Sequence, residues 1–201
     1  MNLHTLQAAL HPLQAAPMGA GWNTALAAFL AEPLREAAVL VGLVERESGW
    51  QVVFTRRTEH LRTHAGEVSF PGGAMEAQDR DAVATALRET REEIGIPAQS
   101  IRPLGFLDPL MTISGFRVMP VVAALAADYQ AAPDPQEVAE VFELPLSFLL
   151  APESLFHSSR QWRGQTLRIA ELHPWPGHPA RVWGATAMIV ENLRNRLEAA
   201  R

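Results

Sequence analysis

Residues 88–95 read Arg-Glu-Thr-Arg-Glu-Glu-Ile-Gly, and this stretch decides the fold. Its three carboxylates are Glu89, Glu92 and Glu93. At about 100° per residue they fall within one arc of an α-helix, whereas Thr90 and Ile94 face the opposite side with further apolar positions. The spacing therefore predicts a helix over 81–94 that Gly95 ends. Three carboxylates so close repel one another, so a positive group should lie beside them, and hard oxygen ligands suit Mg²⁺ or Mn²⁺.

An acidic helix face is also typical of plain solvated surface, with Arg88 and Arg91 as partners of the glutamates. The surroundings favour a site, because a Pro-Gly-Gly loop at 71–73 precedes the helix. The order of residues then resembles the Nudix box, the metal-binding loop and helix of the Nudix hydrolases. The matching positions are Gly73, Asp79, Arg88, Glu89, Glu92, Glu93, Gly95 and Ile96. Asp79 replaces the usual glutamate and lies one residue further from Arg88, and Thr90 replaces an aliphatic residue.

The segment ahead of the box, residues 53–73, resembles the signature of the coenzyme A pyrophosphatases, a Nudix subfamily in which the box is also one residue longer. The matching positions are Thr55, Arg57, Leu61, Arg62, His64, Gly66, Phe70, Pro71, Gly72 and Gly73. Physically the segment suits a polyphosphate, because it concentrates cationic groups in an acidic protein. We expect substrate contacts from Arg56, Arg57, Arg62, His64 and Gly73. The alternative is a solvated strand end with His64 hydrogen-bonded in the core.

The family resemblance also implies roles within the box. Glu89 and Glu93 become the principal metal ligands, the backbone carbonyl of Gly72 becomes a further one, and Glu92 is a third ligand or a proton acceptor. Arg88 orients a glutamate and Gly95 ends the helix, so both are structural. The general base is Glu92 or a later acid, which means Glu137, Glu140 or Glu143. Glu137 is preferred because its Glu-Val-x-x-Val context resembles the family, although it equally suits a surface acid at a strand start.

The rest of the chain predicts a mixed α/β domain. We expect strands over 37–44, 51–55, 101–107, 116–125 and 138–144, near Leu155 and over 167–172, and helices near 3–13 and over 23–31 and 185–199. These elements indicate an α/β/α sandwich with a mixed β-sheet between helices, as the Nudix resemblance implies. Residues 1–36 are expected to be a helical extension packed on a Nudix domain of residues 37–201. Residues 181–187 resemble the strand-to-helix junction of the subfamily, and also suit a packed corner.

Composition limits the possible partners. The 201 residues carry a formal charge of -5 and no cysteine. This argues against nucleic-acid binding, thiol catalysis and iron–sulfur clusters, and the absence of a signal peptide or an apolar span favours a cytoplasmic protein without membrane contact. All 17 basic residues are arginines, so phosphate would be held by guanidinium groups or backbone amides. A homodimer is one candidate assembly that the family resemblance implies.

These observations lead to one preferred function and two alternatives. The resemblance implies a Mg²⁺- or Mn²⁺-dependent hydrolase that cleaves the diphosphate of coenzyme A or its derivatives to 3′,5′-ADP and 4′-phosphopantetheine. A Nudix hydrolase of another nucleoside diphosphate derivative, such as ADP-ribose, is the second reading. A catalytically silent nucleotide-binding Nudix domain is the third, although such a domain has no evident need for three clustered carboxylates.

Overall fold

A mixed β-sheet forms the centre of the molecule. This computed structural model describes residues 2–19, 21, 30, 33–61, 63–162, 164–178 and 181–200, and eight strands of this part of the chain join into the sheet. The strands are β1 (Arg35–Arg46), β2 (Gly49–Arg57), β3 (Val68–Ser69), β4 (Gly72–Ala74), β5 (Ile101–Phe106), β6 (Leu110–Met111), β7 (Phe116–Leu125) and β8 (Val138–Pro145). The main order is β3-β2-β1-β7-β5, with β8 on β2, β4 on β1 and β6 on β7.

The strand β1 organises the sheet, because three other strands pair with it. It runs antiparallel to β2 after a tight turn and parallel to β7, in a register from Arg35↔Phe116 to Leu43↔Ala124. Its other contact is β4, where Val39 lies opposite Gly72. This third pairing fixes the glycine loop against the central strand.

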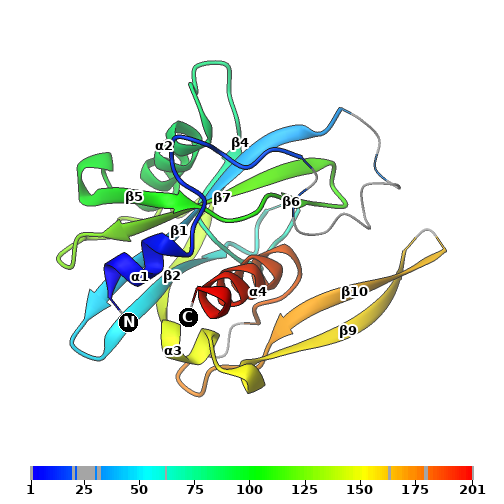
Figure 1. Cartoon of the computed structure of the whole chain (residues 1–201). Coiled ribbons are helices and arrows are strands. Elements are labelled where there is room, and N and C mark those ends of the chain that lie inside the picture. The colour runs from blue at the N-terminus through cyan, green and yellow to red at the C-terminus, as the bar shows by residue number, and fades with distance from the viewer. Residues whose placement is uncertain are drawn as a thin grey trace.

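Helices cover both faces of this sheet (Figure 1). The helix α2 (Ala82–Ile94) packs on one face, where Leu40 and Val44 of β1 lie in the same apolar cluster as Ala86 and Ile94. The other face carries α1 (Leu3–Ala8), α3 (Leu146–Leu149) and α4 (Gly184–Ala199). Alternate residues of β1 thus enter two separate cores. The expected mixed α/β sandwich is confirmed.

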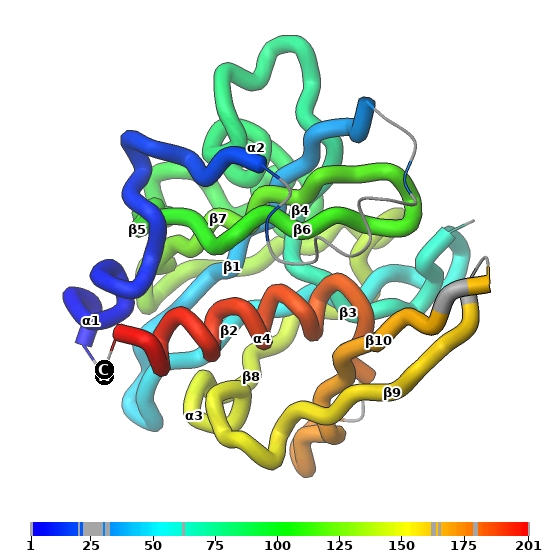
Figure 2. The backbone as a smooth tube through the Cα atoms, turned by 45° about the vertical axis from the view of Figure 1, so that its right-hand side comes forward, coloured from blue at the N-terminus to red at the C-terminus, as the bar shows by residue number. Residues whose placement is uncertain are grey.

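A second, two-stranded sheet stands beside the main one. Its strands are β9 (Leu155–Trp162) and β10 (Gln165–Leu172), which form an antiparallel hairpin that projects from the body in Figure 1. The hairpin packs along α4 through β10. Figure 2 shows the first turns of α4 between β6 and β10, so these two strands lie on opposite sides of the helix.

Most of the expected elements are confirmed. The strands over 37–44, 51–55 and 116–125 are β1, β2 and β7, and the helices over 81–94 and 185–199 are α2 and α4. The first expected helix is shorter than the leucine spacing suggested, and short 3-10 helices occupy Ala98–Ser100 and Pro152–Ser154. The helix expected over 23–31 falls on residues of which only Leu30 is described.

The N-terminal residues are joined to the end of the chain. Leu6 and Leu10 are buried in the core that α4 covers. The Arg196 guanidinium donates to the Ala9 carbonyl at 2.7 Å and to Asp108 at 3.1 Å, and Asp108 also contacts His11 at 2.8 Å. In both Figure 1 and Figure 2, α1 lies near the C-terminal end of α4. None of the described helices is both long and apolar enough to cross a membrane.

Candidate active site

The helix α2 has well-defined ends. The Asp81 carboxylate accepts the Ala84 amide at 2.8 Å at the N-terminus, and Gly95 ends the helix in the left-handed conformation with φ 71°. A side chain at Gly95 would collide with Ala132 in the following loop. The loop is attached to the helix end, because the Asp134 amide donates to the Glu93 carbonyl at 2.9 Å.

The three glutamates of α2 differ in burial. Glu93 is 5% exposed and lies with Thr90 on the sheet side, whereas the Glu92 side chain is 59% exposed. The Glu89 side chain, at 16%, lies between these extremes. The carboxylates therefore extend from the sheet to solvent instead of sharing one exposed face.

Arg88 connects the helix with the preceding loop. Its guanidinium donates to Glu89 at 2.8 Å, to Glu92 at 3.0 Å and to the Ala74 carbonyl at 3.0 Å. It also holds Asp79 at 2.9 Å, and this hydrogen bond is the main reason why the pKa of Asp79 falls to about 2. Asp79, which replaces the usual glutamate of the box, therefore carries the ion pair that anchors the loop.

The glycine loop lies directly against Glu89. A side chain on Gly73 would overlap the Glu89 carboxylate, and one on Gly72 would overlap Ala38 and Val39 of β1. A Cβ at Gly72 would therefore disturb the strand pairing, whereas one at Gly73 would displace the Glu89 carboxylate. The loop brings backbone groups to the same side of the helix as the acidic residues.

Burial and mutual repulsion disfavour negative charge on Glu93 and Glu89. Burial raises the pKa of Glu93 to about 8; the Arg57 charge opposes this rise, and Glu89 and Glu137 add to it. Burial also raises the pKa of Glu89, against the Arg88 hydrogen bond and with help from Glu92 and Glu137. The negative charge of Glu137 thus acts on both carboxylates.

This set of oxygens suits a divalent cation chemically. Buried carboxylates that resist ionisation gain most from a nearby positive charge, and glutamate oxygens are the ligands of Mg²⁺ and Mn²⁺. Among the described residues, no three acidic or histidine side chains are grouped closely enough to hold a metal ion by themselves. Water and substrate oxygens would therefore have to complete the coordination.

The arginines of the preceding segment point to different places. Arg57 lines a cavity beside the glycine loop, and its buried Nε has no hydrogen-bond partner among the described residues. Arg56 instead donates to Glu140 at 3.1 Å and does not line that cavity. Arg62 lies outside the described residues.

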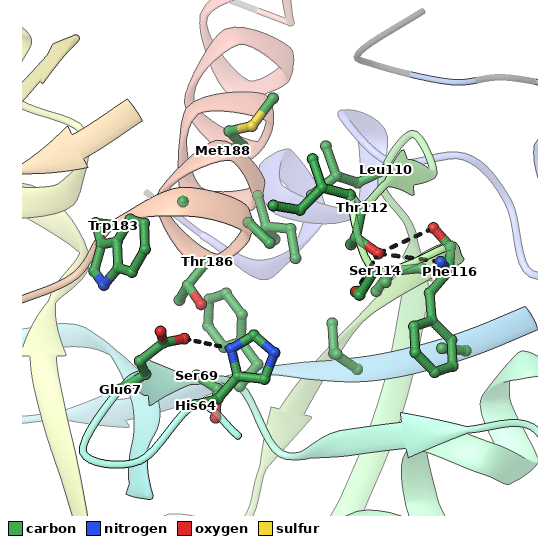
Figure 3. Close-up of a pocket in the computed structure, with 18 of the residues that line it drawn as sticks. His64, Glu67, Ser69, Leu110, Thr112, Ser114, Phe116, Trp183, Thr186 and Met188 are labelled. Carbon is green, nitrogen blue, oxygen red and sulfur yellow. Dashed lines mark hydrogen bonds and ion pairs between the residues drawn. The ribbon is translucent and has the colours of Figure 1, made fainter. Parts of the chain in front are cut away.

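His64 also faces the cavity and is backbone-strained. Its φ of 58° is unusual for a residue other than glycine, and its Nδ1 lies 2.8 Å from Glu67 (Figure 3). The sequence indicated His64 but gave no signal for Glu67. Together they form one rim of the cavity.

The cavity has a volume of about 770 Å³. Arg57, Gly72 and Gly73 line it next to the carboxylates of α2, and its other walls come from β6, β10 and the start of α4. Figure 3 shows Leu110 and Thr112 on one side of α4 and Trp183 on the other. Trp183 falls in the junction at 181–187, whereas no sequence signal indicated Leu110 or Met188 as cavity residues.

Comparisons with known proteins show what this chain is similar to. The sequence model of the NUDIX domain matches residues 33–165. A protein of Pectobacterium atrosepticum named "Uncharacterized Nudix hydrolase NudL" is 41% identical over 159 residues, which is 79% of this chain and 81% of that protein. One of Photorhabdus laumondii with the same name is 37% identical over 84% of this chain and 88% of its own. A crystal structure of a Nudix hydrolase from M. smegmatis, RenU, is 18% identical, covers 69% of this chain and 79% of its own, and has a TM-score of 0.49.

Proposed function

The chain belongs to the Nudix family, and on this premise we propose that it is a metal-dependent hydrolase that cleaves the diphosphate linkage of coenzyme A or its derivatives. The products would be 3′,5′-ADP and 4′-phosphopantetheine. Nudix hydrolases act on pyrophosphate bonds and generally depend on divalent metal ions. The choice of coenzyme A as substrate and of Mg²⁺ or Mn²⁺ as the metal is our proposal.

One observation carries the proposal: Gly73 lines a large cavity and lies directly against the Glu89 carboxylate of α2. Arg57 lines this cavity and also lowers the pKa of Glu93, so it lies between the substrate space and the carboxylates. A diphosphate placed there would meet the Arg57 guanidinium fork beside the glycine loop. The mostly apolar lining beyond it suits a long uncharged arm such as pantetheine.

The proposed metal ligands are Glu89 and Glu93, with Glu92 and the Gly72 carbonyl as further candidates. A bound Mg²⁺ or Mn²⁺ would supply Lewis acidity and a more acidic water. The surrounding residues fit this role, because a cation would favour the charged forms of Glu89 and Glu93, whose pKa values are raised by burial and, to a lesser extent, by neighbouring glutamates. Arg88 would position the Glu89 carboxylate through its 2.8 Å hydrogen bond.

Glu137 is the proposed general base, which takes the proton of the attacking water. The loop fixes its backbone, since its carbonyl accepts the Thr58 amide at 3.0 Å and its own amide donates to Asp134 at 3.0 Å. Its side chain is exposed yet acts electrostatically on Glu89 and Glu93. We expect Glu137→Gln to slow turnover by roughly 100-fold while metal affinity, measured by calorimetry, persists. Near-normal turnover would remove Glu137 from this role.

The test of the proposed function is product analysis by mass spectrometry. Pure protein is incubated with coenzyme A, ADP-ribose or NADH, each with and without Mg²⁺ or Mn²⁺. We expect metal-dependent 3′,5′-ADP from coenzyme A, well above turnover of the other two. Cleavage of the other substrates alone would refute the coenzyme A assignment, and no cleavage at all would favour a nucleotide-binding domain.

The same assay tests the metal ligands. Glu89→Gln and Glu93→Gln should each abolish most turnover, while the matched control Glu198→Gln, an exposed glutamate on α4, should keep it. Full activity of both α2 variants would show that the metal is held elsewhere.

A further inference from the structure

The hairpin β9–β10 brings an arginine into the cavity that the proposed mechanism does not use. Arg168 of β10 lines the same 770 Å³ cavity as Arg57 and Gly73. Figures 2 and 3 place β10 and β6 on opposite sides of the first turns of α4. Arg168 therefore belongs to a different wall of the cavity from β6. Among the described residues, two arginines therefore line the cavity, Arg57 on β2 and Arg168 on the hairpin.

A chain of two half-buried groups holds Arg168. Its Nη2 lies 2.9 Å from His157 Nδ1 across the hairpin. The opposite nitrogen of that ring, Nε2, lies 3.1 Å from Glu191 on α4. The side chains of His157 and Glu191 are 19% and 17% exposed, and their contact links the hairpin to the helix.

The direction of these hydrogen bonds follows from the donors available. A guanidinium has only donors, so His157 Nδ1 must accept from Arg168. The ring proton then lies on Nε2 and is donated to Glu191, which fixes the ring in one neutral tautomer. The Arg168 side chain uses one of its five N–H groups in this contact. Within the described part of the chain, that side chain makes no other hydrogen bond. Its remaining donors are free for a ligand.

The space around Arg168 can take such a ligand. A smaller cavity of about 240 Å³, lined by His157, Arg168, Ala170, Met188 and Glu191, adjoins the main one, because Arg168 and Met188 line both. Among the described lining residues the acids are Glu67, which contacts His64, and Glu191, which accepts a hydrogen bond from His157. In a protein of net charge -5, a pre-oriented cation with free donors favours an anion at this wall.

We propose that Arg168, positioned by His157 and Glu191, binds a phosphate monoester of the substrate that is distinct from the diphosphate being cleaved. This rests on the proposed function, because the diphosphate must occupy the glycine-loop end of the cavity. In coenzyme A the group is the ribose 3′-phosphate. Its dianionic oxygens match the guanidinium fork, and ADP-ribose and NADH carry no such group. Arg168 would thus determine which diphosphates the cavity accepts.

The experiment compares coenzyme A with dephospho-coenzyme A, which lacks the 3′-phosphate. Wild type should have a kcat/KM for coenzyme A that is roughly 10-fold to 100-fold higher, the range expected for hydrogen bonds to a charged group. Arg168→Gln should remove this preference by lowering kcat/KM for coenzyme A alone. His157→Ala should reduce the preference less, since Arg168 stays but loses its orientation. The control is Arg102→Gln, an exposed arginine on β5 that does not line the cavity and should change neither value.

Two outcomes would overturn the assignment of Arg168. One is an equal loss of kcat/KM for both substrates, and the other is no loss for either. If wild type cleaves neither, the proposed function fails, and calorimetry with adenosine 3′,5′-bisphosphate and AMP then decides the anion site. Weaker binding of the bisphosphate alone by Arg168→Gln supports the site, whereas unchanged binding of the bisphosphate refutes it.

Discussion

At the scale of single residues, the candidate site depends on the absence of a side chain at Gly73, which leaves space for the Glu89 carboxylate. Gly73 has no side chain that could intervene between the loop and Glu89. The Glu89 carboxylate is the flexible end of its side chain, so an added methyl group would displace the carboxylate and leave the backbone in place. A substitution at Gly73 should therefore impair catalysis with little effect on folding.

We expect Gly73→Ala to lower turnover at least 10-fold while the free energy of unfolding changes by less than about 1 kcal/mol. The reason is that a 1 Å displacement of a catalytic group costs far more in rate than in stability. Turnover and urea denaturation measure the two effects. Gly164→Ala on the hairpin, where an added Cβ would have no neighbouring atom within 4 Å, is the activity control. Normal turnover of Gly73→Ala would separate Glu89 from the chemistry.

Asp79 gives a pH-dependent prediction. Its pKa of about 2 in the folded protein lies below the value of about 3.9 in an unfolded chain, so its ion pair with Arg88 stabilises the fold above pH 4 and is lost as the pH falls toward 2. Asp79→Asn should destabilise the protein by roughly 1–3 kcal/mol at pH 7. Urea titrations should show this difference shrinking below pH 4; a difference independent of pH would contradict the assignment.

At the scale of elements, the end of α2 fixes the loop that carries Glu137. Gly95 is left-handed, and a methyl group there would lie 2.8 Å from the Ala132 Cβ. The same turn is bonded to the loop through the Ala132 amide, which donates to the Ile94 carbonyl at 2.8 Å. The helix end and the proposed base are therefore coupled.

Gly95→Ala should cost roughly 2–4 kcal/mol of unfolding free energy, because the left-handed backbone and the collision add. Gly115→Ala is the matched control: its φ is 83° and an added Cβ would have no neighbouring atom within 4 Å, so only the backbone cost of about 1–2 kcal/mol remains. Guanidinium denaturation compares the two variants. Equal losses would show that the loop moves freely away from the helix.

Local sequence signals predicted these elements well. The apolar run of β1, the helical spacing over 81–94 and the Gly95 stop are all short-range features, and each corresponds to an element of the structure. The cavity walls were not predicted, since β6, β10 and α4 meet only through long-range packing. For the same reason the sequence did not distinguish Arg56 from Arg57, although neighbouring residues of a strand face opposite sides.

At the scale of the whole molecule, the N-terminal residues complete the core under α4. Leu6 is 1% exposed and belongs to the same apolar cluster as Leu193 and Leu197. The polar contacts of His11 and Arg196 close the edge of this cluster. We propose that this part of the 1–36 extension serves stability instead of substrate binding.

Leu6→Ala should therefore lower the unfolding free energy by roughly 2–5 kcal/mol, the range of large-to-small changes in a core. Leu13→Ala, at a side chain that is 37% exposed, should cost less than about 1 kcal/mol. Thermal and urea unfolding measure both variants, and kcat/KM should stay unchanged where each remains folded. A small loss for Leu6→Ala would mean that the extension is not part of the core.

The parallel pairing of β1 with β7 affects how the chain reaches its native state. All of 47–115 lies between these neighbours, including the glycine loop and α2. Parallel neighbours require such a crossover, and non-local pairs form late because the intervening chain must first lose its freedom. We therefore expect refolding to be slow for a chain of this length, and the acidic helix to acquire its final environment in the same kinetic phase as the central strands.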